Sequence, residues 1–408
     1  MPDSSIRILI VSMNYEPEVT GIAPYVKSLV QKLQESNRVH VMTTHPHYPT
    51  WKIFPGYKGL TMKSSEQNLR VTRLRHYIPN PPIGIRRLLS ELSFSLRVFL
   101  GRTSHPKLAV LLSPSLLSSA TLLVKLKIFS PKTKAIIWVQ DIYTLGLVET
   151  AQGNSLTRIL FKYLEKWTML NSSHIVVIHD RFQRYIQNEF GISPEKISQI
   201  PNWNHVSIAL SETRIDRDYF GWSKDKIVVL HTGNMGTKQG LANVVLAARM
   251  AEERGLPIHF VLMGNGGEFA NLTKLSEGLS NLEFLESVSD ELYPQVLKLS
   301  DILLVSQIKG VSDMAVPSKL TSYFQSGKPV VASVDKNGIT ALEIVSANAG
   351  VIVDPENPEE LLKSIGQLYS KPDQMRYYGV QAKEYAERNM SEEVSLSKWS
   401  QVILGQLK

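Results

Sequence analysis

The chain has 408 residues, of which 43% are apolar and 20% charged, a composition typical of a globular protein and not of a disordered one. This length allows two domains of ordinary size. The sequence contains no cysteine, which excludes disulfides, thiolate metal sites and cysteine nucleophiles. Its N-terminus lacks a basic segment before a long apolar core, so we do not expect a secretory signal.

Charge is distributed unevenly along the chain. Residues 1–200 carry 25 Lys and Arg against 12 Asp and Glu, whereas the remainder carries 20 against 25. A basic half indicates an anionic partner, and because no nucleic-acid-binding signature is present we expect a membrane surface and no nucleic acid. The longest uncharged run, Leu108–Val124, is interrupted by serines and a proline and is too short to span a membrane. We therefore expect a cytoplasmic protein that can lie peripherally on the inner face of the cell membrane.

The first predicted strand, Ile6–Ser12, leads through a turn into an amphipathic helix that ends near Leu33. This pattern is typical of the first unit of a doubly wound parallel-sheet domain. Gly21 lies in the turn, where the absence of a side chain lets the backbone approach a diphosphate closely. A glycine at this place can also serve the turn alone.

Aromatic residues follow the second predicted strand, Val39–Thr44. Tyr48 and Trp51 lie in a proline-rich loop at its carboxyl end. Their faces suit a sugar or a lipid, and they can equally form a hydrophobic plug that closes the sheet. The neighbouring His45 and His47 do not match common zinc spacings, so we expect no metal.

A basic amphipathic helix is predicted within Ile83–Arg102. Apolar residues recur there at helical spacing, and three arginines accompany them within the helix. Such helices lie on anionic membranes. Alternatively, the helix packs on its own domain and its arginines face water.

Polar residues end two further buried strands. Gln140 and Asp141 follow Ala135–Val139, and His179 follows His174–Ile178. Side chains at the carboxyl ends of parallel strands are placed for chemistry. Asp141 and His179 can equally cap the helices that follow them.

A second series of strands and helices begins with the strand Ile227–His231. A glycine-rich loop follows it and precedes a helix that starts near Leu241. Gly236 allows backbone amides to face an anion, and Lys238 adds a point charge. No Lys-Ser or Lys-Thr pair follows, so this is not a Walker loop. The loop therefore predicts a diphosphate site.

The stretch Val311–Glu343 reads as a loop, a helix that begins at Pro317, a turn at Gly327, a buried strand and a second helix. Two helix N-termini would point at the carboxyl end of the sheet, where open α/β folds bind ligands and where helix N-termini favour anions.

Three segments of this stretch carry a resemblance. PSKL at 317–320, GKPVVAS at 327–333 and GITALE at 338–343 resemble the nucleotide-sugar-binding region of glycosyltransferase family 4, especially its members in bacterial exopolysaccharide, colanic-acid and O-antigen synthesis. The resemblance implies the GT-B architecture, an α/β fold of two Rossmann-like, doubly wound parallel-sheet domains that face a cleft. We expect an acceptor domain over residues 1–200, a nucleotide-sugar domain over 201–372, and C-terminal helices over 373–408 that cross back to the first domain.

The resemblance also implies roles for individual residues. We expect the donor diphosphate at Gly21, Asn234, Gly236, Lys238 and Gln239. We expect the nucleoside and its sugar at Gly264, Val288, Asp313, Val316, Pro317, Ser318, Lys319, Ser322 and Glu343. Contact with the reacting groups is expected from Asp141, Gln140 and His179, and the acceptor side from Tyr48 and Trp51.

One departure from the family pattern concerns its two glutamates, spaced eight positions apart. Met314 and Ser322 occupy their places here. The sugar and ribose contacts of those glutamates therefore do not transfer directly, and Asp313 and Glu343 are acidic neighbours that could replace them.

The function implied is that of a retaining, metal-independent glycosyltransferase. It would move a hexose or N-acetylhexosamine from a UDP- or GDP-linked donor, without another cofactor, to a lipid-linked or oligosaccharide acceptor. Two alternatives stay open. One is a nucleotide-sugar 2-epimerase of the same fold, and the other is a catalytically degenerate subunit that supports a partner transferase.

Overall fold

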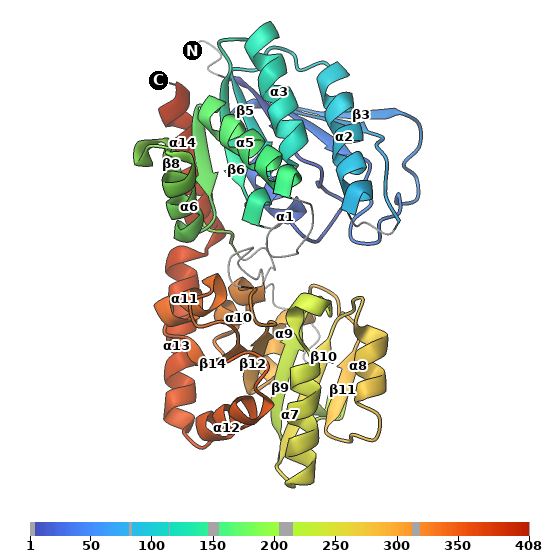
Figure 1. Cartoon of the computed structure of the whole chain (residues 1–408), viewed down its shortest axis with the longest axis vertical. Coiled ribbons are helices and arrows are strands. Elements are labelled where there is room, and N and C mark those ends of the chain that lie inside the picture. Colours follow the sequence, from blue (N-terminus) through green and yellow to red (C-terminus); the bar gives the residue numbers. More distant parts are fainter. Residues whose placement is uncertain are drawn as a thin grey trace. The chain divides into compact units, whose positions relative to one another are not determined.

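The computed structural model describes residues 5–80, 84–113, 115–145, 155–203, 215–311 and 319–407. The chain divides into two compact units, which are described separately (Figure 1). Unit 1 comprises residues 1–202 and 392–408, and unit 2 comprises residues 203–391.

Unit 1 is built on an eight-stranded sheet of order β3-β4-β2-β1-β5-β6-β7-β8, parallel except for the hairpin of β3 and β4. Its strands are β1 (Arg7–Val11), β2 (Arg38–Thr44), β3 (Thr61–Glu66), β4 (Leu69–Leu74), β5 (Leu108–Leu112), β6 (Lys134–Val139), β7 (His174–Val177) and β8 (Ile197–Gln199). The central strands are nearly continuous apolar runs, buried on both faces as expected for a parallel sheet covered by helices.

Helices cover both faces of this sheet. They are α1 (Ala23–Gln34), α2 (Gly84–Leu100), α3 (Leu116–Phe129), α5 (Ser155–Asn171), α6 (Asp180–Phe190) and α14 (Glu392–Leu407). Helix α3 packs against both α2 and α5, and the three lie side by side in Figure 1. Right-handed crossovers place α1 on the opposite face, where α14 packs against it.

Unit 2 is built on a six-stranded parallel sheet of order β11-β10-β9-β12-β13-β14. Its strands are β9 (Ile227–Thr232), β10 (Ile258–Met263), β11 (Leu282–Leu285), β12 (Ile302–Ser306), β13 (Val330–Ser333) and β14 (Gly350–Val353). Its helices are α7 (Ala242–Glu253), α8 (Phe269–Leu275), α9 (Tyr293–Leu299), α10 (Lys319–Ser326), α11 (Ile339–Ser346), α12 (Pro358–Tyr369) and α13 (Pro372–Asn389). Two hydrophobic cores, one on each face, hold these helices to the sheet. The predicted α/β class with two doubly wound sheets is confirmed.

The C-terminal helices divide differently from the expected boundary at residue 372. Helix α13 belongs to unit 2, and the chain returns to unit 1 only at Glu392. The physical reason is close packing of α13 on α10, because a Cβ on Gly379 would lie 2.1 Å from the carbonyl oxygen of Gly327. Gly327 itself has a φ of 71°, as predicted for a left-handed helix cap.

Helix α2 exposes the apolar stripe that the sequence reveals. Ile85 and Leu96 are 73% and 58% exposed, whereas Ser90, Glu91 and Ser95 are buried together with two apolar residues of the same helix. The helix nevertheless packs on its own unit, against α3, and Arg86 and Arg87 face water, as the alternative predicted. Among the described residues, no helix combines the length and apolar character needed to cross a bilayer.

Candidate functional site

The glycine-rich loop of unit 2 runs from the end of β9 to the start of α7. Gly233 has a φ of 104°, a conformation that favours glycine. The amide of Gly236 donates to the side-chain oxygen of Gln239 (3.1 Å), and the amide of Met235 donates to the carbonyl of Asn265 (2.9 Å). Asn234 also donates to Gln239, at 3.4 Å. The predicted diphosphate residues Asn234, Gly236, Lys238 and Gln239 thus share one ordered loop.

Gly264, which was predicted from the loop after β10, lies directly against this loop. A Cβ on Gly264 would fall 2.0 Å from the carbonyl oxygen of Gly233, and its φ is 136°. A Cβ on Gly266 would fall 2.4 Å from the carbonyl oxygen of Met235. The two loops can therefore touch backbone to backbone only because glycines stand at both places.

Lys319 reaches the same loop from the start of α10. Its Nζ lies 3.2 Å from Nε2 of His231 and 3.8 Å from the position a Cβ on Gly233 would take. Nδ1 of His231 lies 3.2 Å from the carbonyl of Leu304, which can only accept, so Nε2 carries the lone pair that faces the ammonium. Burial, followed by the charge of Lys319, lowers the pKa of His231 and keeps this imidazole neutral.

Burial also lowers the pKa of Lys319 to about 7. An anion bound at the loop would favour the protonated ammonium and raise this pKa again. The donor contact of Lys319 stays a prediction, and His231, which was not predicted, holds the Lys319 ammonium beside the loop.

Ser322, at one of the two departures from the family pattern, is buried in a network of hydroxyl groups. It hydrogen-bonds to Tyr293, whose hydroxyl lies 3.0 Å from that of Thr232. Tyr323 accepts from the amide of Thr232 (2.9 Å) and donates to Leu304 (3.3 Å). The serine thus joins the network that fixes the end of β9 beside the glycine-rich loop.

The remaining predicted donor residues are spread over unit 2. Glu343 is buried on α11, where its carboxylate accepts from the hydroxyl of Tyr385 on α13 (3.0 Å). Val288 follows β11 and packs against the core of the unit. Asp313, Met314, Val316, Pro317 and Ser318 lie outside the described residues.

A pocket of about 200 Å³ in unit 1 brings together four predicted residues from three separate loops. They are Gly21, Tyr48, Trp51 and Asp141. The other lining residues are Met13, Asn14, Ile22, His47, Arg87, Ser90 and Glu91. Gly21 has a φ of 65°, and a Cβ there would lie 3.4 Å from the Tyr48 ring. The rings of Tyr48 and Trp51 meet edge to face, with centroids 6.2 Å apart.

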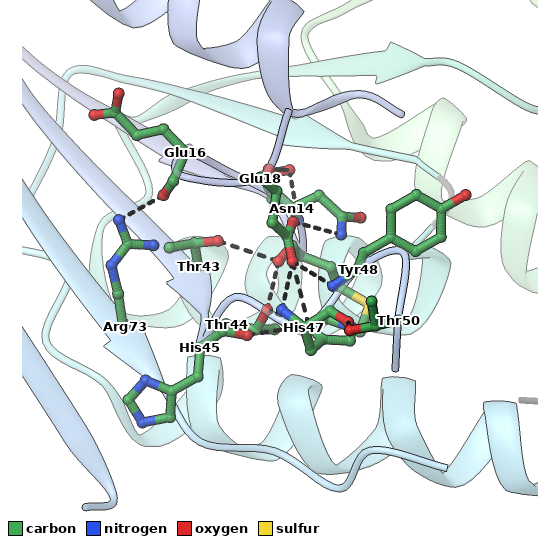
Figure 2. A network of polar contacts seen from close by, with 12 residues as sticks. Asn14, Glu16, Glu18, Thr43, Thr44, His45, His47, Tyr48, Thr50 and Arg73 are labelled. Atoms are coloured by element: carbon green, nitrogen blue, oxygen red, sulfur yellow. Dashed lines mark hydrogen bonds and ion pairs between the residues drawn. The ribbon is translucent and has the colours of Figure 1, made fainter. Parts of the chain in front are cut away.

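A buried carboxylate, Glu18, holds the aromatic wall of this pocket in place (Figure 2). Its Oε1 accepts from the amides of His47 (2.7 Å) and Tyr48 (2.8 Å), and its Oε2 accepts from the side chain of Asn14 (2.8 Å). Burial lowers the pKa of His47 although the Glu18 charge acts in the opposite direction. The loop after β2 is therefore tied to the loop after β1 by one carboxylate.

Glu91 is a lining residue that the sequence analysis missed. It is 3% exposed, and its Oε2 has no hydrogen-bond partner among the described residues. Burial raises the pKa of the Glu91 carboxyl to about 8, although the charge of Arg87 lowers it. The signal in the sequence is a lone acidic residue between apolar positions of a basic helix.

Gln140 and His179 have structural partners. The Gln140 amide exchanges two hydrogen bonds with Asn202, at 3.1 and 2.8 Å. Nδ1 of His179 accepts from the amide of Arg181 (3.1 Å), so this residue caps α6. Of the three residues expected at the reacting groups, only Asp141 lines the pocket.

In comparisons with known proteins, each of the two units matches a family model of glycosyl transferases. Residues 20–203 match the family model described as glycosyl transferase 4-like domain, and residues 212–385 match that of glycosyl transferases group 1. The chain is 29% identical to the glycosyl transferase WcaI of Escherichia coli K12, named for colanic acid biosynthesis, over 98% of this chain and 100% of that protein.

Solved structures agree with the fold. Sucrose-phosphate synthase from Thermosynechococcus elongatus matches with a TM-score of 0.72 and 15% identity, over 98% of each chain. Anabaena HepE, solved in complex with UDP, matches with a TM-score of 0.70 and 16% identity, over 98% of this chain and 100% of that one.

Proposed function

Because this chain belongs to the glycosyltransferases of the GT-B fold, with a 4-like domain followed by a group 1 domain, we propose that it transfers a sugar from a nucleotide donor to a lipid-linked glycan with retention of configuration. The donor sugar would be a hexose or an N-acetylhexosamine. The product would enter an exopolysaccharide or O-antigen, a proposal supported by the likeness to WcaI.

The observation that carries this proposal is the glycine-rich loop at the end of β9. It combines a backbone without side chains at Gly233 and Gly236 with two lysines, Lys238 within the loop and Lys319 beside it. Such a combination suits a diphosphate, because the ammonium groups compensate its charge and the glycines let it approach the backbone closely. The UDP in the HepE structure supports a nucleoside diphosphate as the ligand class.

In the proposed reaction the bond between the anomeric carbon and the diphosphate oxygen breaks, and the acceptor oxygen bonds to the same face of that carbon. The acceptor proton passes to the leaving phosphate oxygen, so charge and atoms balance. The main electrostatic task is to stabilise the leaving diphosphate. We assign this task to the two lysines, without a metal.

Replacement of Lys238 tests the donor site. Lys238→Ala removes one charge-assisted contact, so UDP or GDP should bind about 10–100-fold more weakly, and release of nucleoside diphosphate from a panel of nucleotide sugars should fall in parallel. Lys274→Ala, an exposed lysine of α8, is the matched control. Equal nucleotide affinity in the two variants would contradict a diphosphate at this loop.

The two alternatives predict different products from the same assay. A 2-epimerase would form an epimerised sugar without acceptor. A degenerate subunit, which the replacements at Met314 and Ser322 favour, would release no diphosphate unless a partner protein were added. Release that needs only the purified chain and depends on Lys238 would argue against the subunit.

The apolar face of unit 1 supports contact with a lipid surface. Helices α2, α3 and α5 lie side by side, and each exposes large apolar residues. Those more than half exposed are Ile85, Leu92, Leu96 and Leu100 on α2, Ile128 and Phe129 on α3, and Leu156, Ile159, Leu160 and Tyr163 on α5. The three helices contain only two acidic residues, Glu91 and Glu165, and both are buried.

Basic residues accompany this apolar face, among them Arg86, Arg158, Lys162 and Lys166. A second copy of the chain would bring like charges together, whereas an anionic membrane complements both the charge and the apolar area. We therefore propose that unit 1 lies on an anionic membrane through Ile83–Arg102, and that α3 and α5 enlarge the surface.

Flotation with vesicles tests the membrane proposal. The wild-type chain should float with vesicles that contain anionic lipid and float less with neutral vesicles or at high salt. The combined change Leu89→Ser, Leu92→Ser and Leu96→Ser removes apolar area and should lower the bound fraction severalfold. Leu246→Ser with Leu275→Ser, on unit 2, is the control. Flotation that is unchanged by the α2 substitutions would contradict the proposal.

A further inference from the structure

We propose that a basic pocket between the hairpin of β3 and β4 and the C-terminal end of α2 binds the phosphate head group of one anionic phospholipid. The inference rests on the membrane contact proposed for unit 1 and deepens it, because it assigns a lipid phosphate to particular side chains. Neither the motifs of the sequence nor the likeness to known proteins assigns a ligand to this place.

The pocket has a volume of about 280 Å³ and lies where β3 and β4 approach α2 (Figure 1). The hairpin supplies one wall, and the last turn of α2 with the residues after it supplies the other. The polar residues that line it are Thr61, Lys63, Arg70, Thr72, Arg97 and Arg102.

Four cations line this pocket, and no carboxylate of the described residues lines it with them. The side chains of Lys63, Arg70 and Arg102 have no hydrogen-bond or ion-pair partner in the part of the chain that the structure describes. The fourth cation, Arg97, is held in place because its Nη2 donates to the hydroxyl of Thr61 (2.8 Å). Cations gathered without a counter-charge repel one another, and a bound anion would remove that repulsion.

The sheet register makes two of these cations converge. Lys63 stands opposite Thr72, and Arg70 lies two residues before Thr72 on the same face of the sheet. Nε2 of His40, on β2, lies 2.9 Å from the hydroxyl of Thr72. Burial, followed by the charges of Arg70 and Lys63, lowers the pKa of His40 to about 4, so the imidazole stays neutral. The charges of both side chains therefore act on one place, as the several acceptor oxygens of a phosphate require.

The rim of the pocket favours a lipid over a soluble phosphate. Leu100 lines the pocket, is 70% exposed and belongs to the apolar face of unit 1. Leu96, about one turn earlier, is also exposed on that face. A phosphate held by the cations would thus have apolar surface directly beside it, where acyl chains can lie. A free phosphate would use the cations alone, whereas an anionic phospholipid complements both features.

This pocket is separate from the pocket that contains Asp141. Ser90 and Glu91 of α2 line that other pocket, and Leu100 follows Ser90 by ten residues. At a rise of 1.5 Å per residue the two places lie about 15 Å apart along the helix. Substitutions in the basic pocket should therefore leave nucleotide binding by unit 2 unchanged.

The experiment uses the full chain and dihexanoyl phosphatidylglycerol below its critical micelle concentration, observed by ³¹P NMR. The wild type should bind this lipid saturably and should not bind dihexanoyl phosphatidylcholine, whose head group carries no net charge. Lys63→Gln combined with Arg102→Gln changes two exposed side chains and should weaken binding about 10–100-fold, since two charge-assisted contacts are lost. Arg70→Gln, a change inside the pocket, should weaken binding about tenfold.

Lys107→Gln combined with Lys132→Gln removes the same charge from exposed positions of unit 1 outside the pocket and is the matched control. An equal loss in this control and in the pocket variant would mean diffuse attraction and overturn the site, as would absence of binding by the wild type. Glycerophosphoglycerol, the same head group without acyl chains, should bind much more weakly. Equal affinity for it would assign the pocket to a soluble phosphate and overturn the lipid.

Flotation with vesicles separates this inference from the proposed membrane contact. Loss of flotation in the α2 leucine variant, with the pocket variant floating as the wild type does, would contradict the pocket and keep the membrane surface. Saturable binding of the short-chain lipid by a chain that does not float would support the pocket and count against the membrane surface.

Discussion

Gly264→Ala should abolish tight nucleotide binding and lower the stability of unit 2 by roughly 2–4 kcal/mol. The new Cβ would lie 2.0 Å from the carbonyl oxygen of Gly233 and 2.8 Å from its carbonyl carbon. Both are backbone atoms, so no change of side-chain rotamer can relieve the contact. A φ of 136° adds strain that alanine does not tolerate. The glycine-rich loop must therefore move away from the loop after β10.

The matched control is Gly267→Ala, three residues further along the same loop. A Cβ on Gly267 meets no atom within 4 Å, so this substitution should change neither stability nor binding appreciably. Calorimetric titration with UDP and GDP, together with urea unfolding, measures both effects. If Gly264→Ala binds nucleotide as tightly as Gly267→Ala does, the contact between these two loops does not shape the site.

The glycine-rich loop shows what the sequence can reveal. The order of the segments is a buried apolar strand, a glycine-rich loop and a helix. This order alone predicts most of the backbone path from β9 to α7. Gly264 and Lys319 were also expected near the donor, but the contacts of their atoms with Gly233 and His231 depend on tertiary packing. Those distances could not be read from the residues.

Helix α2 shows the opposite case. Its apolar stripe is plain in the sequence, yet the structure exposes most of that stripe and buries Ser90, Glu91 and Ser95 beside Phe94 and Val98. Ser95 is satisfied by Thr121, whose hydroxyl lies 2.6 Å away, and by the carbonyl of Leu117 (3.1 Å). Amphipathicity identifies two faces without saying which one meets the core. Glu91 was missed for this reason.

The hairpin of β3 and β4 was not predicted either. Residues of β3 are mostly exposed and polar, so the strand lacks the apolar alternation that marks a half-buried strand. It forms because β4 pairs with β2 inside the sheet and offers its other edge. Pairing with a neighbour, and not the local residues, decides such an edge strand.

Trp399→Ala should lower the stability of unit 1 by about 3–5 kcal/mol, the usual cost of removing a buried aromatic side chain. Trp399 lies on α14 and is fully buried, and its ring meets that of Trp138 on β6 edge to face, with centroids 4.8 Å apart. Ser395 and Ile403, one turn before and after, are buried on the same side of the helix. The Trp399 side chain thus anchors residues 392–408 to residues 1–202, which form the rest of unit 1.

The effect should be confined to unit 1, because Trp399 belongs to that unit alone. Calorimetry of the variant should show a transition that moves to lower temperature, while nucleotide affinity, a property assigned to unit 2, changes little. Leu404→Ala, on the same helix but 61% exposed, is the control and should cost well under 1 kcal/mol. Equal decreases in unfolding temperature for the two variants would mean that the buried Trp399 ring does not hold α14 on unit 1.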